Sequence, residues 1–368
     1  MKILLLGLTK IKYMPYARFY LEQLCVPGNE VHLAFWNRDL QPEQKPAQQV
    51  ILHEFSRSQN DEEHPVKKIG SFREYRRFAC RLLDSGNFDL VVILHSLTGA
   101  VVFDRLKKYA GRYILDYRDV TYESFLPYRR LIASMVNLSA LTLVSSDAFR
   151  TLLPQSDKIL TSHNISPEEY TARPVRMETV HTPVRIGFWG YIRNPKVNLK
   201  IMEHLGNDPR FELHYYGREQ KTAMQLKTYC IYNKLKNVFF HGEYSPEERS
   251  GFASKTDIVH NMYDNDAVMS RAVSNKYYDA LIFRLPQLCT HGSYMGRLVD
   301  EKGIGISVDP EDSLFADRVF AYYNCLNAER FDAACDKELD RVLGEYHACT
   351  EAIHALCISL NASLSEDK

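Results

Sequence analysis

The chain has 368 residues, of which 45% are hydrophobic and 25% charged, as in ordinary globular proteins. Its 46 Lys and Arg residues equal its 46 Asp and Glu residues, so it lacks the basic excess of nucleic-acid-binding proteins, and no nucleic-acid partner is expected. No segment offers the roughly 18 uninterrupted apolar residues of a membrane span, so any membrane association should be peripheral. The length exceeds what one hydrophobic core usually organises, which favours two domains.

The cysteines bear on the cellular compartment. They form no CxxC pair, and several fall within apolar runs, so we expect buried free thiols. Free thiols persist in a reducing compartment, which predicts a cytoplasmic protein, with the inner face of the membrane as the place of any peripheral contact. The eight residues are Cys25, Cys80, Cys230, Cys289, Cys325, Cys335, Cys349 and Cys357.

The first half of the chain alternates apolar strands with helical segments. The expected strands are 3–6, 31–35, 50–52, 90–94, 113–115, 141–144 and 159–161. The expected helices are 16–24, 72–83 and 98–109, with a further one before residue 141. Because short buried strands separated by helices are typical of a parallel sheet, this half is predicted to be a doubly wound α/β domain.

The same alternation restarts after a polar, proline-containing segment, Ser166 to Pro183, which has the composition of a linker. The expected strands of the second half are 184–188, 212–216, 238–240, 258–261, 286–289 and 304–308. Helices are expected at 199–205 and 246–253, after Ser274 and Ser293, and from about residue 313 onward. We therefore predict an N-terminal domain 1–175, a C-terminal domain 176–345 and a C-terminal helix 346–368 that could pack back on the first domain.

Ligands of open parallel sheets bind beyond the carboxyl ends of the strands. Gly190 directly follows the strand 184–188, and a glycine there lets the backbone approach a ligand closely. The next helix offers its N-terminus to a phosphate, and Arg193 and Lys196 add positive charge. Gly217 and the pair His241-Gly242 occupy corresponding strand ends.

A second group of residues opens the helix after Ser274, which is a suitable N-cap. Lys276 and Asp279 are three residues apart, so they share one helix face. The lysine could meet a diphosphate, and the carboxylate could accept hydrogen bonds from two ribose hydroxyls. The turn with Gly292, Ser293 and Tyr294 opens the next helix and would supply a second anion site.

Each pattern also has an ordinary structural reading. Gly190 could belong to a plain strand-to-helix turn, and Lys276 and Asp279 to a surface ion pair. The basic segment with Arg73, Arg76, Arg77 and Arg81, and the later pair Arg129-Arg130, could be solvated helix faces or a rim for anionic lipid or a diphosphate-linked acceptor. Asp264-Asn265-Asp266 matches a DxD metal motif, although acidic residues also favour turns for conformational reasons.

The second half resembles family 4-like GT-B glycosyltransferases of surface polysaccharide synthesis. The resemblance rests on NKYYDALIFRLPQL followed by GIGISV, and on the order IGFWGYIR, HYYG, NVFFHGEYSPEE and TDIVHNMY. It implies two Rossmann-like domains facing across a cleft, a nucleotide-sugar donor, and neither a cofactor nor an essential metal. By position it implies that Arg193 and Lys196 contact the donor diphosphate, that Gly242 lies near the base and that Asp279 lies near the ribose.

Two positions depart from the family pattern. Arg271 stands where the family often has the first of two glutamates, and Arg284-Leu285 replaces the glycine that commonly precedes the proline segment. The first of these glutamates is associated with the sugar end of the donor, so the departure bears on sugar identity, on retaining stereochemistry and on whether catalysis is preserved.

The first half is then expected to supply the acceptor side. His95 and Asp119, which follow strands, are the candidate catalytic bases, because either could take a hydroxyl proton. Capping and packing are their structural alternatives. Gly7, Thr9, Lys10 and Arg118 are the other acceptor-side candidates, with Arg118 steering an anionic acceptor.

These observations lead to one hypothesis with two alternatives. The leading hypothesis is metal-independent transfer of a sugar from a nucleoside-diphosphate sugar, with UDP favoured, to a saccharide or lipid-linked glycan acceptor. The alternatives are a sugar-nucleotide epimerase on the same fold and a non-catalytic relative that binds nucleotide or glycan.

Overall fold

The computed structural model describes residues 1–59, 65–165 and 181–366, which fall into two compact units. The first unit contains Met1–His163 together with Gly344–Lys368, and the second contains Asn164–Leu343. The divisions thus lie at 163/164 and 343/344, where the sequence suggested 175/176 and 345/346. Most of the predicted linker lies outside the described residues.

The first unit is built on a seven-stranded sheet whose order is β3-β2-β1-β4-β5-β6-β7. Every neighbouring pair is parallel, which confirms the predicted doubly wound sheet. The strand order reverses between β1 and β4, so the loops after these two strands diverge and leave room for a ligand. The strands are β1 (Lys2–Gly7), β2 (Glu30–Asn37), β3 (Ile51–Ser56), β4 (Leu90–Leu94), β5 (Tyr113–Tyr117), β6 (Leu141–Val144) and β7 (Ile159–Thr161).

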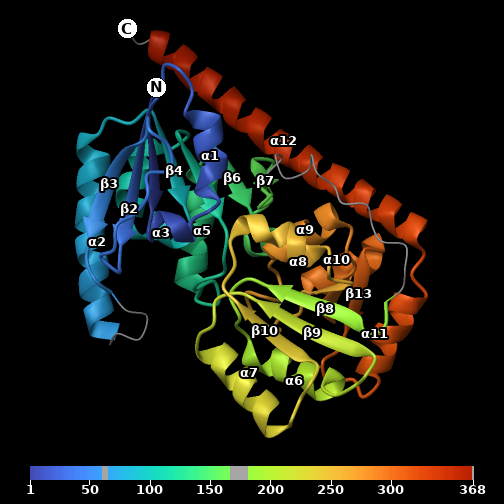
Figure 1. The fold of residues 1–368 in the computed structure, drawn as a ribbon. Coiled ribbons are helices and arrows are strands. Elements are labelled where there is room, and N and C mark those ends of the chain that lie inside the picture. The colour runs from blue at the N-terminus through green and yellow to red at the C-terminus, as the bar shows by residue number, and fades with distance from the viewer. Residues whose placement is uncertain (60–64, 166–180, 367–368) are drawn as a thin grey trace. The chain divides into compact units, whose positions relative to one another are not determined.

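Helices cover this sheet (Figure 1). They are α1 (Ala17–Leu24), α2 (Pro65–Ser85), α3 (Ser96–Val101), α4 (Phe103–Leu106) and α5 (Leu126–Leu138), with 3-10 turns η1 (Ile11–Tyr13), η2 (Lys107–Tyr109) and η3 (Asp147–Leu152). The single helix predicted over 98–109 is wrong. Val102 is fully buried and leaves helical geometry at φ −114° and ψ 16°, which divides the segment into α3, α4 and η2.

The second unit has a six-stranded parallel sheet of order β10-β9-β8-β11-β12-β13, again as predicted. Its order reverses between β8 and β11. The strands are β8 (Val184–Trp189), β9 (Phe211–Tyr216), β10 (Val238–Gly242), β11 (Ile258–His260), β12 (Gln287–Thr290) and β13 (Gly305–Val308). The helices are α6 (Pro195–Leu205), α7 (Lys221–Tyr232), α8 (Arg249–Ala253), which follows the 3-10 turn η5 (Pro246–Glu248), α9 (Asn275–Phe283), α10 (Tyr294–Lys302) and α11 (Phe315–Asn324).

The sequence did not predict α7. Its apolar residues do not gather on one face: Leu226 and Cys230 are buried, whereas Met224, Ile231 and Tyr232 are exposed. A helix without a single apolar stripe has a weak periodic signal, which explains why it was missed.

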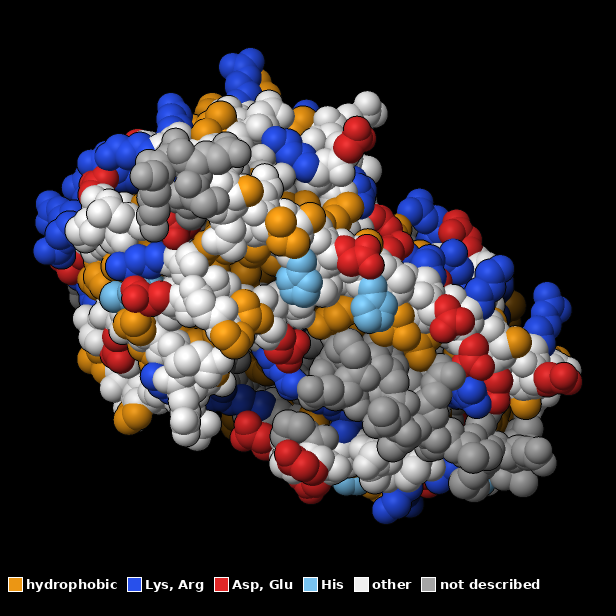
Figure 2. Space-filling model, turned by 90° about the horizontal axis from the view of Figure 1, so that it is seen from above, with side chains coloured by type: hydrophobic (Ala, Val, Ile, Leu, Met, Phe, Trp, Pro, Cys, Tyr) orange, Lys and Arg blue, Asp and Glu red, His pale blue; other side chains and the backbone are white. Residues whose placement is uncertain are grey.

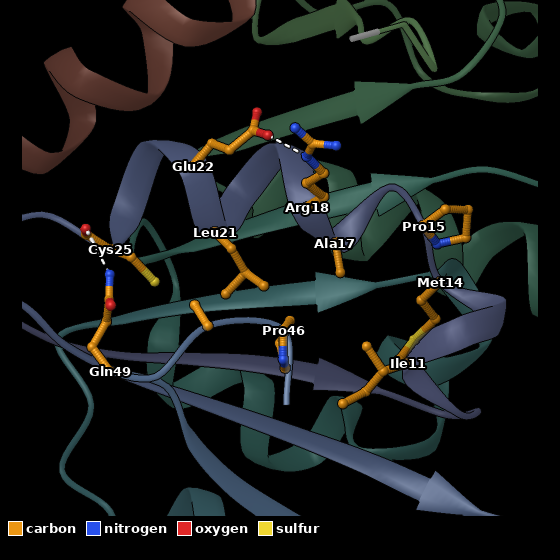
Figure 3. Close-up of a pocket in the computed structure, with 11 residues that line it drawn as sticks. Ile11, Met14, Pro15, Ala17, Arg18, Leu21, Glu22, Cys25, Pro46 and Gln49 are labelled. Carbon is orange, nitrogen blue, oxygen red and sulfur yellow. Dashed lines mark hydrogen bonds and ion pairs between the residues drawn. The ribbon is translucent and has the colours of Figure 1, made fainter. Parts of the chain in front are cut away.

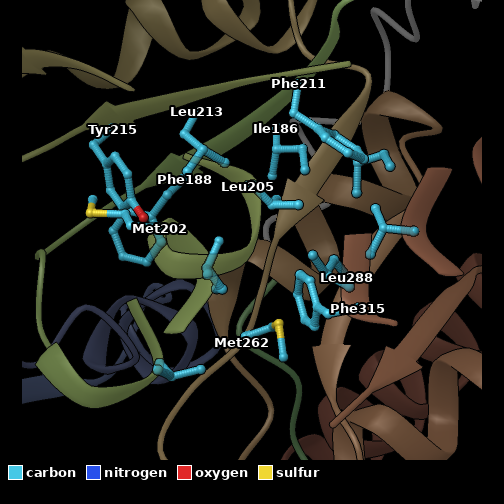
Figure 4. Packing of buried hydrophobic residues seen from close by; sticks show 14 of the residues in the cluster. Ile186, Phe188, Met202, Leu205, Phe211, Leu213, Tyr215, Met262, Leu288 and Phe315 are labelled. Carbon is cyan, nitrogen blue, oxygen red and sulfur yellow. The ribbon is translucent and has the colours of Figure 1, made fainter. Parts of the chain in front are cut away.

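The core of the second unit joins the sheet to its helices. Figure 4 shows Ile186 and Phe188 of β8 and Leu213 of β9 packed with Leu205 of α6 and Phe315 of α11. The central strand β8 is buried at nearly every position, so its backbone is a rigid support for the turn that follows it.

One long helix, α12 (Ala328–Glu366), contributes to both units (Figure 1). In the second unit, Tyr277 Oη donates a 2.8 Å hydrogen bond to Glu338. In the first unit, the Cys349 thiol donates to the Thr161 carbonyl at 3.2 Å, and the Tyr346 ring meets Phe19 edge-on at 5.1 Å.

Five cysteines are buried, but the expectation of buried thiols is wrong for Cys325, which is exposed, and only partly right for Cys25 and Cys357. All eight are free thiols. No helix within the described ranges is long and apolar enough to cross a membrane.

Charges of both signs are spread over the face seen in Figure 2, and basic side chains gather toward the side on which α2 lies in Figure 1. On α2, Arg73, Arg77 and Arg81 are exposed at four-residue intervals and form one solvated face. Arg76 instead ion-pairs with Asp104 at 2.8 Å.

Candidate functional site

Three neighbouring strands of the second unit end in glycine turns. Gly190, Gly217 and Gly242 lie at the ends of β8, β9 and β10, and all have positive φ, at 119°, 149° and 81°. A Cβ at Gly217 would lie 1.8 Å from the Gly190 carbonyl oxygen, so no larger residue fits there. The three turns therefore present bare backbone along one edge of the sheet.

Two cations meet at one aromatic ring beside these turns. The Lys276 ammonium lies 4.7 Å from the centroid of the Tyr263 ring and hydrogen-bonds the Tyr263 hydroxyl. The Arg193 guanidinium lies 5.7 Å from the same ring centroid. Lys276 is nearly buried and also lies 4.1 Å from the Phe188 ring, whereas Arg193 and Lys196 are exposed and form no ion pair with any described residue. Arg193 and Lys276 thus both lie against the Tyr263 ring.

The turn before α10 is connected to this ring. Tyr263 N–H donates to Thr290 Oγ1 at 3.0 Å, and Ser293 Oγ donates to the Thr290 carbonyl at 2.7 Å. Ser293 also caps α10 by accepting from Gly296 N–H at 2.9 Å. A Cβ at Gly292 would come within 3.7 Å of the Asn265 amide nitrogen, so the loop after β11 lies against this turn. Ser293 therefore belongs to the same region as Arg193 and Lys276.

Some helix-end amides that the sequence suggested as phosphate donors are already used within the protein. Val197 N–H, in the first turn of α6, donates to Asp264 Oδ1 at 2.9 Å. Tyr294 N–H donates to the Ser270 carbonyl at 2.9 Å. Because these two amides already have acceptors, an anion at this site would be bound mainly by the positively charged side chains.

Asp279 lies one turn beyond Lys276 on α9 and is buried. Its Oδ2 accepts a 2.7 Å hydrogen bond from Trp189 Nε1, and its Oδ1 accepts a 3.0 Å bond from Arg249. Burial raises the pKa of this carboxyl above its ordinary value, against the lowering effect of Arg249. Trp189 and Arg249 hold the carboxylate in one orientation, and each oxygen keeps a lone pair for another donor.

A stack of aromatic rings runs from the exposed end of β10 toward this carboxylate. The Tyr216 ring stacks on His241 at 4.2 Å and on Phe252 at 4.4 Å, and Phe252 meets Trp189 at 5.5 Å. Burial lowers the pKa of His241, which favours its neutral ring. A flat heterocycle could stack at the exposed end of this column.

Asn198 and His260 support the turn that carries Arg193. The Asn198 amide donates to the carbonyls of Arg193 and Asn194 at 2.9 and 2.8 Å. His260 Nδ1 accepts from Met262 N–H at 3.2 Å, so Nε2 carries the proton and donates to Asn198 Oδ1 at 2.9 Å. Both side chains are buried, and the chain of bonds fixes the Arg193 backbone.

The acidic motif after β11 is used in turns. Besides the bond from Val197 to Asp264, Asp266 Oδ1 accepts from the amides of Val268 and Met269 at 2.8 Å. Across the described residues, no group of three or more His, Cys, Asp or Glu side chains is arranged to hold a metal ion.

The two unusual arginines differ in their surroundings. Arg284 ends α9 in the left-handed conformation, at φ 50°, which is the position where helices commonly have glycine. Its guanidinium ion-pairs with Asp336 of α12 at 3.0 Å, so this arginine fastens α9 to α12. Arg271 donates to the Ala267 carbonyl at 3.0 Å within the loop before α9. Ser274 precedes α9 as predicted, but its hydroxyl donates to Asn261 Oδ1 at 2.6 Å and does not cap the helix.

In the first unit, His95 follows β4 with a positive φ of 84°, which is rare outside glycine and often marks functional positions. Its Nδ1 accepts from Leu97 N–H at 3.1 Å, and its Nε2 lies 4.0 Å from Asp119 Oδ2. Burial lowers the pKa of His95, so the ring is neutral and its proton sits on Nε2. In this tautomer His95 can donate a hydrogen bond from Nε2 but cannot accept a proton there, whereas the exposed Asp119 carboxylate can.

Three of the other acceptor-side candidates make contacts within the first unit. Lys10 is buried and ion-pairs with Asp39 at 2.6 Å. Arg118 is buried, ion-pairs with Asp116 at 2.6 Å and lies 4.7 Å from the Tyr16 ring centroid. The Gly7 carbonyl accepts from Tyr75 Oη at 2.6 Å, and Thr9 lies partly buried in the loop after β1.

A cavity of about 610 Å³ lies beside α1 in the first unit. Figure 3 shows Leu21 pointing from α1 toward Pro46, while Arg18 and Glu22 form an ion pair on the same helix. Its wall is mostly apolar, made by Ile11, Met14, Pro15, Ala17, Arg18, Leu21, Glu22, Cys25, Pro46, Ala47 and Gln49. Its size suits a small organic group.

Solved structures match this fold over nearly its whole length. Sucrose-phosphate synthase of Thermosynechococcus elongatus has a TM-score of 0.71 at 12% identity, covering 98% of this chain and 99% of that one. Anabaena HepE in complex with UDP has a TM-score of 0.66 at 13% identity, covering 96% and 100%. Trehalose-6-phosphate synthase of Burkholderia multivorans has a TM-score of 0.66 at 10% identity, covering 100% and 98%.

These structural neighbours are GT-B glycosyltransferases, and at such low identity the likeness shows the fold alone: the chain has the two-domain GT-B fold. No protein-family model matches the sequence, and no curated protein matches it.

Sequence reasoning missed five residues that complete the site in the second unit. They are Trp189, Asn198, Arg249, His260 and Tyr263. Trp189, His260 and Tyr263 lie at or just after strand ends, and that position was the available signal. Asn198 and Arg249 lie in helices, and only their hydrogen bonds reveal them.

Proposed function

We propose that the protein is a glycosyltransferase that moves a sugar from a nucleoside-diphosphate sugar to a saccharide or lipid-linked glycan acceptor. The observation that carries the proposal is the convergence of Arg193 and Lys276 on the Tyr263 ring, next to the Ser293 turn. Two cations beside bare glycine turns suit a diphosphate, whose negative charge grows as it departs.

UDP is the nucleotide that we favour. HepE has been solved in complex with UDP and with UDP-glucose, and it shares the fold of this chain. In our proposal Asp279 accepts hydrogen bonds from the ribose, and the base stacks near His241 and Gly242. The diphosphate is bound by Arg193, Lys196 and Lys276.

In the reaction the acceptor hydroxyl oxygen bonds to the anomeric carbon, while the bond from that carbon to the diphosphate oxygen breaks. Positive charge on Arg193 and Lys276 stabilises the departing diphosphate without a metal ion. If the configuration inverts, Asp119 takes the hydroxyl proton, and His95 supplies a hydrogen bond from Nε2. If it is retained, the departing phosphate oxygen takes that proton. The apolar cavity beside α1 would accommodate an apolar part of the acceptor.

Calorimetric titration with UDP, UMP and uridine tests the donor site. Wild type should bind UDP more tightly than uridine, and Arg193→Ala or Lys276→Met should each weaken UDP binding about tenfold or more while leaving uridine binding unchanged. Lys200→Ala is the matched control, because this α6 lysine ion-pairs with Glu203 and Glu311. Equal binding of UDP and uridine would rule out the diphosphate site.

Turnover separates transfer from the alternatives. Purified protein would be incubated with UDP-sugars and a lipid and saccharide extract, in the presence of EDTA, and free UDP and new sugar nucleotides would be measured. Release of UDP that depends on the extract supports transfer. Interconversion of UDP-sugars without release would identify an epimerase, and binding without either would identify a non-catalytic relative.

A further inference from the structure

Three large apolar side chains are exposed together where the chain enters α5. Tyr122, Phe125 and Leu126 are 57%, 63% and 53% exposed, and Pro127 beside them is exposed as well. Single exposed apolar residues are common on soluble proteins, but a cluster within six consecutive residues forms a patch.

The patch is held in one conformation by its surroundings. Tyr122 packs edge-on against the buried Tyr128 ring at 5.6 Å, and Phe125 N–H donates to the Tyr122 carbonyl at 2.8 Å. Pro127 sits in the first turn of α5, where its fixed φ favours the helix. The fold therefore imposes the exposure of these side chains.

Two arginines extend the patch by one helical turn. Arg129 and Arg130 are exposed, and the described part of the chain supplies neither with an ion pair. No Asp or Glu occurs between Glu123 and Asp147, and Glu123 is buried, accepting from Tyr117 Oη at 2.8 Å. The segment 124–146 is consequently apolar and positively charged, and the exposed Asp119 carboxylate precedes it on the same loop.

We infer that Tyr122, Phe125, Leu126, Arg129 and Arg130 form a docking face for a membrane surface that contains anionic phospholipid. Phenylalanine and leucine enter the boundary between headgroups and acyl chains, tyrosine lies at headgroup level, and the arginines bind lipid phosphates. The positive charge of Arg129 and Arg130 beside exposed apolar side chains complements the anionic surface of such a membrane. The inference deepens the proposed function, because Asp119 lies on the same loop and would meet an acceptor anchored in that membrane.

Co-sedimentation with vesicles tests the inference. Wild type should bind phosphatidylcholine vesicles that contain about 30% phosphatidylglycerol. It should bind pure phosphatidylcholine vesicles much less, and high salt should weaken its binding to the anionic vesicles. Phe125→Ser/Leu126→Ser and Arg129→Gln/Arg130→Gln should each lower the partition coefficient about tenfold or more.

Two control pairs make the same chemical changes elsewhere. Met224→Ser/Ile231→Ser removes exposed apolar side chains of α7, and Arg73→Gln/Arg77→Gln removes exposed charges of α2. Both should bind vesicles as wild type does. Equal loss in the controls, or no vesicle binding by wild type, overturns the inference. The inference is also overturned if wild type self-associates without binding vesicles and Phe125→Ser/Leu126→Ser abolishes this self-association. The patch would then be a protein interface.

UDP titration of the same variants separates this inference from the proposed function. Failure of vesicle binding with normal UDP affinity overturns only the docking face. Normal vesicle binding by a protein that does not bind UDP overturns only the donor site.

Discussion

Trp189 Nε1 donates a 2.7 Å hydrogen bond to Oδ2 of Asp279, joining the last residue of β8 to the second turn of α9. Both groups are buried, so the bond orients the carboxylate that we assign to the ribose. Trp189→Phe should therefore weaken UDP binding about fivefold, the effect of a hydrogen bond worth about 1 kcal/mol. Calorimetry with UDP measures this change.

The other tryptophan provides a matched control. Trp36 Nε1 donates to the Arg57 carbonyl at 2.8 Å in the first unit. Trp36→Phe removes an equivalent bond and should leave UDP affinity unchanged. Equal losses in the two variants would mean that the effect is one of general stability.

Arg193→Ala should lower turnover of the donor about a hundredfold. An electrostatic group that acts mainly in the transition state typically contributes ~2.7–4 kcal/mol. Steady-state release of UDP gives the ratio of kcat to KM, and Lys200→Ala again serves as the control. Wild-type turnover in Arg193→Ala would remove this residue from the donor site.

His95 is predicted to act as a hydrogen-bond donor. Because Leu97 N–H occupies Nδ1, His95→Gln should preserve more activity than His95→Gly, since a glutamine amide can still donate. Glycine is the suitable deletion at φ 84°, because it removes the side chain without straining the backbone.

The pH profile distinguishes a donor from a base. Burial holds the pKa of His95 below its ordinary value, so the ring stays neutral as the pH falls through about 6.5. Any fall in kcat/KM as the pH is lowered from 7.5 through about 6.5 should accordingly be the same in wild type and His95→Gln. A fall in activity toward acid pH that disappears in His95→Gln would instead identify His95 as the base.

Gly217→Ala should destabilise the second unit by at least about 2 kcal/mol, because of its positive φ and the contact with the Gly190 carbonyl. UDP binding should weaken as well, since the Gly190 turn must move. Gly344→Ala is the control: this glycine is exposed within α12 with no atom near its would-be Cβ, and alanine there should stabilise by about 0.5–1 kcal/mol. Thermal unfolding compares the two.

Acid should destabilise the second unit through His260. Burial lowers its pKa to about 3, whereas an unfolded histidine titrates near 6.5. Below pH 6.5 the unfolded state binds a proton that the folded state does not, so stability falls as the pH drops from 6.5 toward 3. Between pH 7.5 and 5.0 this single group should lower the free energy of unfolding by about 2 kcal/mol.

Urea unfolding in a Trp36→Phe background follows the second unit through Trp189 fluorescence. His260→Asn should reduce the difference between pH 7.5 and 5.0 by about the same 2 kcal/mol, whatever its effect at either pH alone. An unchanged difference would show that His260 does not remain neutral in the folded protein.

The alternation of apolar strands and helices was enough to predict both parallel sheets, because buried strands read as short apolar runs. Helix α7 and the break at Val102 escaped prediction, since burial on mixed faces decides them. The order of strand ends also indicated which loops meet, and so placed Gly190, Arg193, Lys276 and Ser293 in one region.

What the sequence determined by itself was therefore local: strand and helix periodicity, the glycines at strand ends, and a set of cations near them. Only the tertiary structure showed that Arg193 and Lys276 share the ring of Tyr263, that Trp189 and Arg249 hold Asp279, and that Arg284 turns toward Asp336. The physical reason is that a hydrogen bond or cation–π contact joins groups far apart in the chain. Their distance and direction depend on how the strands and helices pack, which residue spacing does not encode.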